Sequence, residues 1–217
     1  MLILASGSPR RQNLLGLLGI PFTVAPADID ERAAAHPALA KAEAVARPGD
    51  VVLAADTMIE LGGERIGKPA DADDAAVMLT RLAGCDHMVR TEVALIGAGG
   101  RRFSFAVRSE VRMRPADPQQ IREYVATGEP LDKAGAYALQ GLGGELVDRY
   151  SGCYANIVGL PLCHVFFALR KMGLAMPERP ESAFARAFGF TCPAWRLAYA
   201  DGRALRDGAE YDSWVRR

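Results

Sequence analysis

The chain has 217 residues, of which 50% are hydrophobic and 24% are charged, which is enough for the core of one large domain or two small ones. Its 26 basic residues balance its 26 acidic residues, so the formal net charge is zero. This balance excludes stable binding to nucleic acid or anionic lipid by bulk charge alone. The longest apolar-rich stretch, residues 157–169, contains Pro161 and His164 and is too short to span a bilayer.

The beginning of the sequence and its cysteines indicate a compartment. Residues 1–5 form an apolar run that is too short for a signal peptide, and arginines follow it instead of preceding it. No CxxC pair and no zinc-site spacing occurs, so we expect reduced, mostly buried thiols at Cys85, Cys153, Cys163 and Cys192. These features predict a cytoplasmic protein.

Strand and helix signals alternate in the first part of the chain. Residues 2–5 predict a short buried strand. Ser8 is a typical helix cap and Pro9 a typical first helical residue, so we expect a helix there that ends at Gly19. The next segments predict a strand at 22–25, a helix at 33–47 and an apolar strand, buried on both faces, at 51–55.

The middle of the chain adds hairpin signals. Residues 88–96 and 102–113 alternate in polarity around the glycine-rich turn at 97–100 and predict two antiparallel strands. Glycines and prolines delimit the remaining elements, which are a turn at 62–63 and helices at about 71–83, 117–128 and 161–172. Parallel-type and hairpin signals in one chain predict a mixed α/β fold.

The composition changes after Gly173. Residues 174–217 contain both tryptophans of the chain, several prolines and scattered arginines, with little periodicity. We therefore expect one domain at residues 1–173 and a C-terminal extension at residues 174–217, to which the sequence assigns no role.

A first candidate for phosphate binding is the loop at residues 6–11, between a predicted strand and a predicted helix. It offers the hydroxyls of Ser6 and Ser8, the guanidinium groups of Arg10 and Arg11, and a helix N-terminus, all of which suit an anion. The alternative is an ordinary serine cap beside solvated arginines.

Two further candidates follow predicted strands. Asp56 comes after the apolar run at 51–55, where a carboxylate can hold Mg²⁺ or accept a proton from water; the alternative is a carboxylate that caps a turn. Lys68 is held between Gly67 and Pro69, which makes it a better phosphate ligand than a lysine on a mobile helix face.

The segment at residues 128–141 is the fourth candidate. Glu129 and Asp132 could be metal ligands, Lys133 a phosphate ligand, and Gln140 an amide that reads the edge of a base. The alternative is a capped helix and a loop with no function.

The histidines do not indicate nucleophilic catalysis. No histidine combines with a serine or cysteine in a recognisable nucleophile motif, and His87, on a predicted strand, is interpreted as a structural residue.

In order and spacing, these segments resemble the Maf-like family of nucleoside triphosphate pyrophosphatases, also called septum-formation proteins. The resemblance covers about residues 2–173. It rests on Leu4-Ala5-Ser6-Gly7-Ser8-Pro9-Arg10-Arg11, Asp28-Ile29-Asp30-Glu31, Ala40-Lys41-Ala42, Ala55-Asp56-Thr57, Gly67-Lys68-Pro69, the segment 128–141, and the segment 156–162.

The resemblance implies a mixed twisted sheet with flanking helices and a central cleft, similar to inosine-triphosphate pyrophosphatase folds, and often a homodimer. It also implies hydrolysis of a nucleoside triphosphate to the monophosphate and pyrophosphate, dependent on Mg²⁺ or Mn²⁺.

The same resemblance assigns site residues. Asp56 matches the family's catalytic base and, with Glu31, a metal site. Substrate preference is set at Arg10, Thr57 and Gln140, a combination that looks like the dTTP/UTP branch. The remaining expected substrate-binding residues are Ser6, Ser8, Arg11, Lys41, Lys68 and Lys133.

The chain departs from the family pattern between Glu31 and Lys41, where residues 32–40 are several residues shorter than usual. Together with the unmatched extension, the shortening supports an alternative hypothesis, a nucleotide- or partner-binding regulator of cell division with little catalysis. A third is a generic phosphate-binding α/β domain with coincidental matches.

Overall fold

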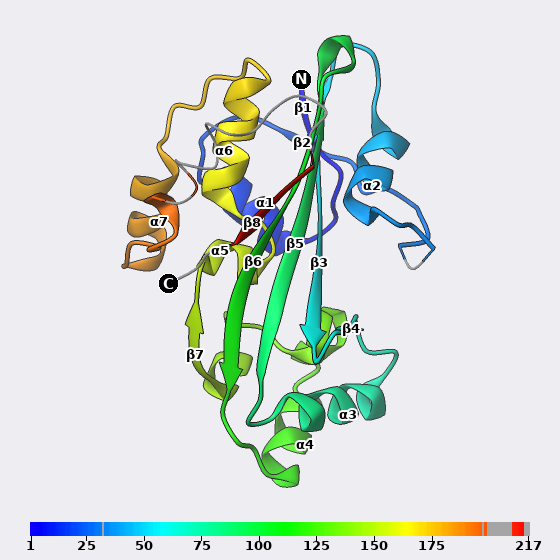
Figure 1. The fold of residues 1–217 in the computed structure, drawn as a ribbon, viewed down its shortest axis with the longest axis vertical. Helices are drawn as coiled ribbons and strands as arrows, with labels where there is room; N and C mark the ends of the chain where they lie inside the picture. Colours follow the sequence, from blue (N-terminus) through cyan, green and yellow to red (C-terminus); the bar gives the residue numbers. More distant parts are fainter. Residues whose placement is uncertain (32, 197, 199–209, 215–217) are drawn as a thin grey trace.

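The computed structural model describes residues 1–31, 33–196 and 198, and the backbone of residues 210–214. A mixed sheet runs through the molecule (Figure 1). Its strand order is β2 (Thr23–Val24), β1 (Leu2–Leu4), β3 (Val51–Leu61), β5 (Asp86–Ile96), β6 (Arg102–Met113) and β7 (Val147–Ser151), while β4 (Glu64–Ile66) pairs with β3 and β8 (Glu210–Trp214) with β6. β1 is parallel to β2 and β3, and β8 is parallel to β6, whereas the pairs β3–β4, β3–β5, β5–β6 and β6–β7 are antiparallel, which confirms the mixed sheet.

Helices cover the two ends of this sheet differently (Figure 1). At the end that contains β1, α2 (Pro37–Val45) covers one face, and the other carries α1 (Pro9–Gly16), α5 (Tyr154–Val158), α6 (Leu162–Lys171) and α7 (Pro180–Phe188). The far end of the long strands carries α3 (Ala72–Leu82) and α4 (Pro118–Ala126). Between α4 and β7 the chain forms three short 3₁₀ helices, η2 (Glu129–Asp132), η3 (Ala134–Ala136) and η4 (Leu142–Leu146).

Three local predictions are corrected. The predicted strand at 51–55 continues to Leu61, because its polar second half still pairs with β5, from Val52 opposite Ile96 to Glu60 opposite Met88. The helix predicted at 33–47 begins only at Pro37, whose ring suits a first helical position. Ser8 is the N-cap of α1, but its side chain makes no capping hydrogen bond.

The hydrophobic core has separate clusters at the two ends. One packs β1, β3, β5 and β6 against α1, α5 and α6, and it includes Phe184, Cys192 and Ala194 of the extension. Another packs the far halves of β3 and β5 against α3 and α4. The described part of the extension is thus packed on the domain, and it contains a helix, α7, that the sequence analysis missed.

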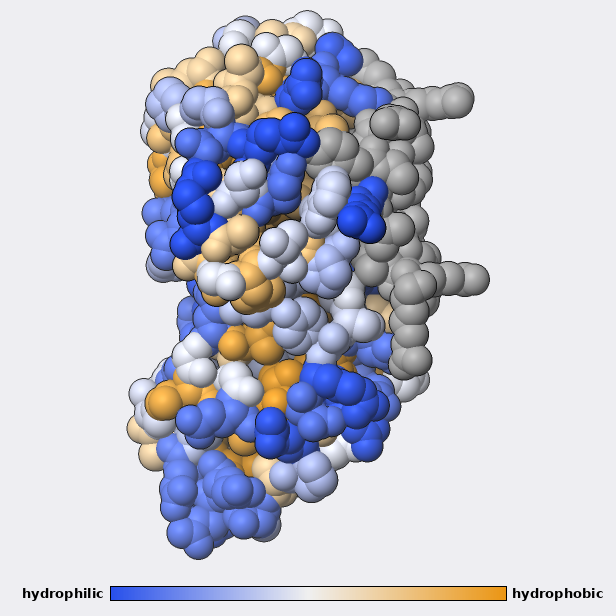
Figure 2. Space-filling model, turned by 90° about the vertical axis from the view of Figure 1, so that its left-hand side faces the viewer, coloured by the Kyte–Doolittle hydropathy of each residue, from blue (hydrophilic) through white to orange (hydrophobic). Residues whose placement is uncertain are grey.

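The surface on the side of α7 and β7 mixes hydrophilic and hydrophobic residues, and its outline narrows between the two ends of the molecule (Figure 2). Within the described residues, no helix combines the length and apolarity needed to cross a membrane. The thiols of Cys153, Cys163 and Cys192 are buried and unbridged, and that of Cys85 is half-buried, as expected.

Candidate active site

A cleft of about 320 Å³ lies between the two ends of the molecule. Each residue that the family resemblance assigned to the site contributes to its lining: Ser6, Ser8, Arg10, Arg11, Glu31, Lys41, Asp56, Thr57, Lys68, Lys133 and Gln140. The fold therefore brings together segments that are far apart in the sequence.

A gap in the sheet explains why one cleft reaches both faces of β3. In the described structure, β1 covers one edge of β3 as far as Leu53, and β4 covers that edge again from Ile59. Asp56 and Thr57 lie in the interval. Adjacent residues of a strand point to opposite faces, and at this open edge both border the cleft. The prediction that Asp56 lies at the end of a strand is therefore wrong, because Asp56 lies in the middle of β3.

Lys41 joins two carboxylates at the cleft. Its Nζ lies 2.8 Å from Oδ1 of Asp56 and 2.9 Å from Oε1 of Glu31. Lys41 and Asp56 are only 6% and 9% exposed, so this ion pair is shielded from water. The shortened segment at 32–40 therefore still places Glu31 against Lys41.

The charge around Glu31 favours its ionised form. Burial raises the pKa of this carboxyl, but the hydrogen bond from Lys41 and the charges of Lys41, Lys68 and Arg11 outweigh burial and hold the pKa below its usual range. Lys68 itself is exposed at the cleft, after β4.

Asp56 keeps one oxygen available. Among the residues that the structure describes, its hydrogen-bond partner is Lys41, which occupies Oδ1. Oδ2 is left for a water molecule or a ligand in the cleft. A carboxylate fixed by a lysine on one oxygen and open on the other can accept a proton from a bound water.

Arg11 is a half-buried side chain that joins three segments on the opposite face of β3. Its Nε donates to the carbonyl of Gly159, its Nη1 to Ser6 Oγ and its Nη2 to Thr57 Oγ1, over 2.9, 3.2 and 3.0 Å. Burial lowers the pKa of this guanidinium, against the opposing charges of Asp56 and Glu31. Arg11, not Arg10, is therefore the arginine that contacts Thr57.

Two buried polar residues that the sequence analysis missed support Thr57. Thr91 Oγ1 lies 2.9 Å from Thr57 Oγ1 and donates to the carbonyl of Asn156. The Asn156 amide in turn donates to Val89 O and Ser109 Oγ. Thr57 and Thr91 are direct cross-strand neighbours, which becomes apparent only when the register of β3 and β5 is known.

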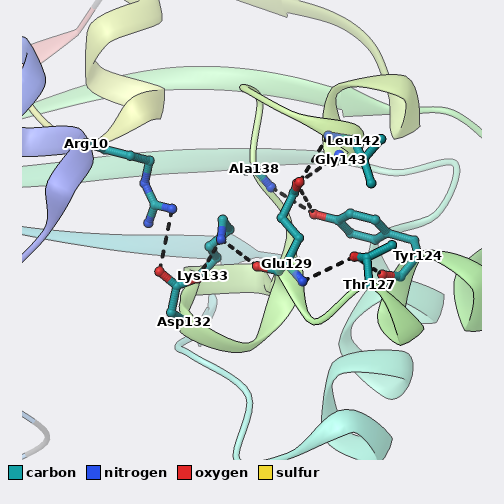
Figure 3. A network of polar contacts seen from close by, with 9 residues as sticks. All are labelled: Arg10, Tyr124, Thr127, Glu129, Asp132, Lys133, Ala138, Leu142 and Gly143. Atoms are coloured by element: carbon teal, nitrogen blue, oxygen red, sulfur yellow. Dashed lines mark hydrogen bonds and ion pairs between the residues drawn. The ribbon is translucent and has the colours of Figure 1, made fainter.

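The other wall of the cleft comes from the segment at 132–140, part of which is drawn in Figure 3. Arg10 reaches across to Asp132, with 3.7 Å between Nη1 and Oδ2. Lys133 Nζ donates to the carbonyl of Glu129 and to Asp132. A ligand in the cleft would thus contact Arg10 and Lys133, whose positive charges the Asp132 carboxylate partly neutralises.

Glu129, a candidate metal ligand, does not line the cleft. Its carboxylate accepts hydrogen bonds from the Tyr124 hydroxyl and from the backbone N–H groups of Leu142 and Gly143 (Figure 3). Burial raises its pKa, but these hydrogen bonds and the charge of Lys133 bring the pKa below its usual value. The interpretation of Glu129 as a metal ligand is wrong, because its oxygens already hold the loop.

His87 is structural, as expected. It is 4% exposed, and its Nε2 lies 2.8 Å from the hydroxyl of Tyr137, a residue of the cleft wall. Burial lowers the pKa of His87 to about 4, so the imidazole is neutral near pH 7.

Glu31 and Asp56 fit a hard divalent cation as a partial donor set. Mg²⁺ usually takes one or two carboxylates and completes its shell with water and substrate phosphates. In the described part of the chain, no group of three or more candidate ligands is preassembled. The pair suits an ion that arrives with a triphosphate.

Fold and cleft define a mixed α/β protein with a paired carboxylate site walled by cationic side chains. The sequence model of the family described as "Maf-like protein" matches residues 1–172. The chain belongs to this family.

Several relatives named dTTP/UTP pyrophosphatase match most of the chain. The chain is 47% identical to a dTTP/UTP pyrophosphatase of Anaeromyxobacter dehalogenans, over 82% of this chain and 98% of the relative. It is 46% identical to one of Hahella chejuensis, over 80% and 92%, and 48% identical to one of Myxococcus xanthus, over 82% and 96%. Among solved structures, a nucleoside-triphosphatase / dITP/XTP pyrophosphatase of Mycobacterium abscessus overlaps partially, with 18% identity and a TM-score of 0.36 over 52% of this chain and 73% of that one.

Proposed function

We propose that the protein hydrolyses dTTP and UTP to the nucleoside monophosphate and pyrophosphate. The observation that carries this proposal is Asp56, fixed through one oxygen by Lys41 in a cleft lined by further cations. The names of the relatives, at 46–48% identity over almost their whole length, support the same activity.

The cations suit the substrate's charge. A triphosphate carries about four negative charges, and one opposite-charge pair at about 4 Å contributes roughly 4 kcal/mol at an effective dielectric constant of 20. Arg10, Lys68 and Lys133 line the cleft and can approach phosphate oxygens. They offset the repulsion that a triphosphate presents to an incoming nucleophile.

Asp56 is the proposed base. A water held by Oδ2 attacks the α-phosphorus and gives its proton to the carboxylate, while the bond from the α-phosphorus to the bridging oxygen breaks. Pyrophosphate leaves with that oxygen. Lys41 keeps the carboxylate in place throughout, because it holds Oδ1 from a buried position.

A divalent cation at Glu31 and Asp56 is part of the proposal. When bound, Mg²⁺ or Mn²⁺ would neutralise phosphate oxygens and polarise the reacting phosphoryl group. The two carboxylates of this chain support it, since the charges of Lys41, Lys68 and Arg11 keep Glu31 ionised.

Base preference is proposed to lie on the face of β3 opposite Lys41. There Arg11 donates a hydrogen bond to Thr57, and Gln140 lines the same cleft. An amide offers one donor and one acceptor, the combination that discriminates among base edges.

One assay tests this function. Pyrophosphate release is measured from dTTP, UTP, dCTP, GTP and ATP, each with Mg²⁺ and with a chelator. The proposal predicts metal-dependent release that is fastest from dTTP and UTP. Nucleotide binding without release from any of them would contradict it and favour the binding regulator.

A further inference from the structure

The hydroxyl of Thr57 lies in the middle of a chain of hydrogen bonds that runs from the cleft into the core. On the cleft side, Arg11 Nη2 lies 3.0 Å from Thr57 Oγ1. On the core side, Thr57 Oγ1 lies 2.9 Å from Thr91 Oγ1, and Thr91 Oγ1 lies 3.0 Å from the carbonyl oxygen of Asn156. Thr57 lines the cleft, whereas Thr91 and Asn156 are 0% exposed. The chain therefore connects a residue that a ligand can touch with two that it cannot.

The two ends of this chain determine the direction of the hydrogen bond between the threonines. A guanidinium only donates, a carbonyl only accepts, and each hydroxyl has one proton to give. Thr91 gives its proton to the Asn156 carbonyl, so the proton between the two hydroxyls comes from Thr57. In the reverse arrangement, the Thr91 oxygen and the carbonyl oxygen would face each other at 3.0 Å with no proton between them. Thr57 thus donates inward to Thr91 and accepts from Arg11.

One lone pair of the Thr57 oxygen remains, because a hydroxyl oxygen has two and Arg11 uses one. An empty space adjoins this oxygen at Gly159, which also lines the cleft and has no side chain. A Cβ placed on Gly159 would lie 3.5 Å from Thr57 Oγ1 and 3.6 Å from Arg11 Nε, with no nearer atom beyond the neighbouring residues of the chain. A ligand atom therefore fits there. Toward it, Thr57 can accept a hydrogen bond but cannot donate one.

An oxygen that only accepts discriminates between pyrimidines. Thymine and uracil carry an N–H at ring position 3, whereas cytosine has a bare nitrogen acceptor at the same place. The Thr57 oxygen can bind the former and repels the latter. A threonine with a free proton would tolerate both, because a hydroxyl that can rotate is either a donor or an acceptor.

We propose that Thr91 is a positioning residue for substrate preference: it takes up the proton of Thr57 and so makes Thr57 an acceptor that selects the N–H of thymine and uracil over cytosine. Thr91 does this without contact with the substrate, since it is fully buried behind Thr57. This inference rests on the proposed function, in which the base lies on this face of β3.

The test compares kcat/KM for dTTP and dCTP in the full-length protein. Thr91→Val removes the hydroxyl and keeps the shape of the side chain, while Thr91→Ser keeps the hydroxyl. The Asn156 carbonyl retains a second donor, the N–H of Gly159 at 3.0 Å, so we expect Thr91→Val to fold. Thr80→Val is the matched control, because the Thr80 hydroxyl also donates to a backbone carbonyl, on α3 outside the cleft lining. Thermal unfolding checks each variant.

The inference predicts that Thr91→Val lowers the dTTP/dCTP ratio of kcat/KM about tenfold, the effect of one neutral hydrogen bond. The value for dTTP should fall and the value for dCTP should stay the same or rise, because the freed Thr57 proton can now be donated to cytosine. Thr91→Ser should restore the ratio, and Thr80→Val should leave it unchanged. In a Thr57→Val background, Thr91→Val should have no further effect, since both act through one hydroxyl.

Other outcomes separate this inference from the function beneath it. A ratio that depends on Thr57 but not on Thr91 overturns the inference alone. An equal loss of kcat/KM for both nucleotides in Thr91→Val also overturns it, since that is a structural effect. If the wild-type protein releases no pyrophosphate, or does not prefer dTTP to dCTP, the proposed function fails and the inference fails with it.

Discussion

Lys41 and Asp56 form a buried ion pair, 2.8 Å from Nζ to Oδ1, that joins α2 to β3 beside the open edge of the sheet. The pair fixes one oxygen of Asp56 and leaves the other toward the cleft. Structure and proposed chemistry therefore depend on the same contact.

Replacement of Lys41 by methionine should destabilise the protein by about 3 kcal/mol, because breaking a buried pair leaves a carboxylate without its counter-ion. The value should lie at the low end of the usual range, since the Glu31 side chain is 42% exposed and water can solvate it. Urea unfolding of Lys41→Met measures this, with Arg122→Met on the exposed side of α4 as the control. Equal stability of the two variants would show that the pair contributes nothing.

Glu129 should be a stability residue, not a metal residue. Oε1 of Glu129 accepts from the N–H of Gly143 and Oε2 from that of Leu142, so the N–H₂ group of Glu129→Gln would face a backbone N–H donor in either orientation, and we expect a loss of about 1–3 kcal/mol. The concentration of Mg²⁺ that gives half-maximal activity should stay the same. A large increase in that concentration, with unchanged stability, would return Glu129 to the metal site.

His87 should make the protein sensitive to acid. Its folded pKa of about 4 lies below the unfolded value of about 6.5, so the unfolded state binds more protons between these values. The stabilisation is therefore complete above about pH 6.5 and falls as the pH drops toward 4, by roughly 3 kcal/mol at about 1.4 kcal/mol per unit.

The measurement is urea unfolding of the wild-type protein and of His87→Gln from pH 7 to pH 4.5. The difference in stability between them should shift in favour of the variant as the pH falls, because glutamine has no proton to bind. Two parallel curves would mean that His87 does not titrate with the reduced pKa.

Much of the site was accessible to sequence reasoning because it consists of short contiguous motifs. Residues 6–11 and Lys68 stand next to a glycine or a proline that marks a loop, Asp56 follows an apolar run, and all of them line the cleft. The mixed sheet followed similarly from an apolar run and a glycine-rich hairpin.

The remainder depends on long-range pairing, which leaves no local signal. Thr91 became a site residue only through the register of β3 with β5, and the polar residues Asp56 and Thr57 lie within β3 because the strand borders the cleft there. The hydrogen bond from Arg11 to Thr57 likewise becomes apparent only when the position of α1 on the sheet is known. Helix α7 was missed because Pro180 and the glycines and prolines near it are typical of loops. Its apolar residue Phe184 packs against Tyr154, a contact that the local sequence does not indicate.

Asp56→Asn is the most direct test of the central claim. Asparagine keeps the size of the side chain and an oxygen for Lys41 but cannot take a proton from water. The account predicts an unchanged fold and a decrease in pyrophosphate release from dTTP and UTP of roughly 10²- to 10⁴-fold, the usual contribution of a general base. Release at nearly the wild-type rate by a folded Asp56→Asn protein would contradict the account.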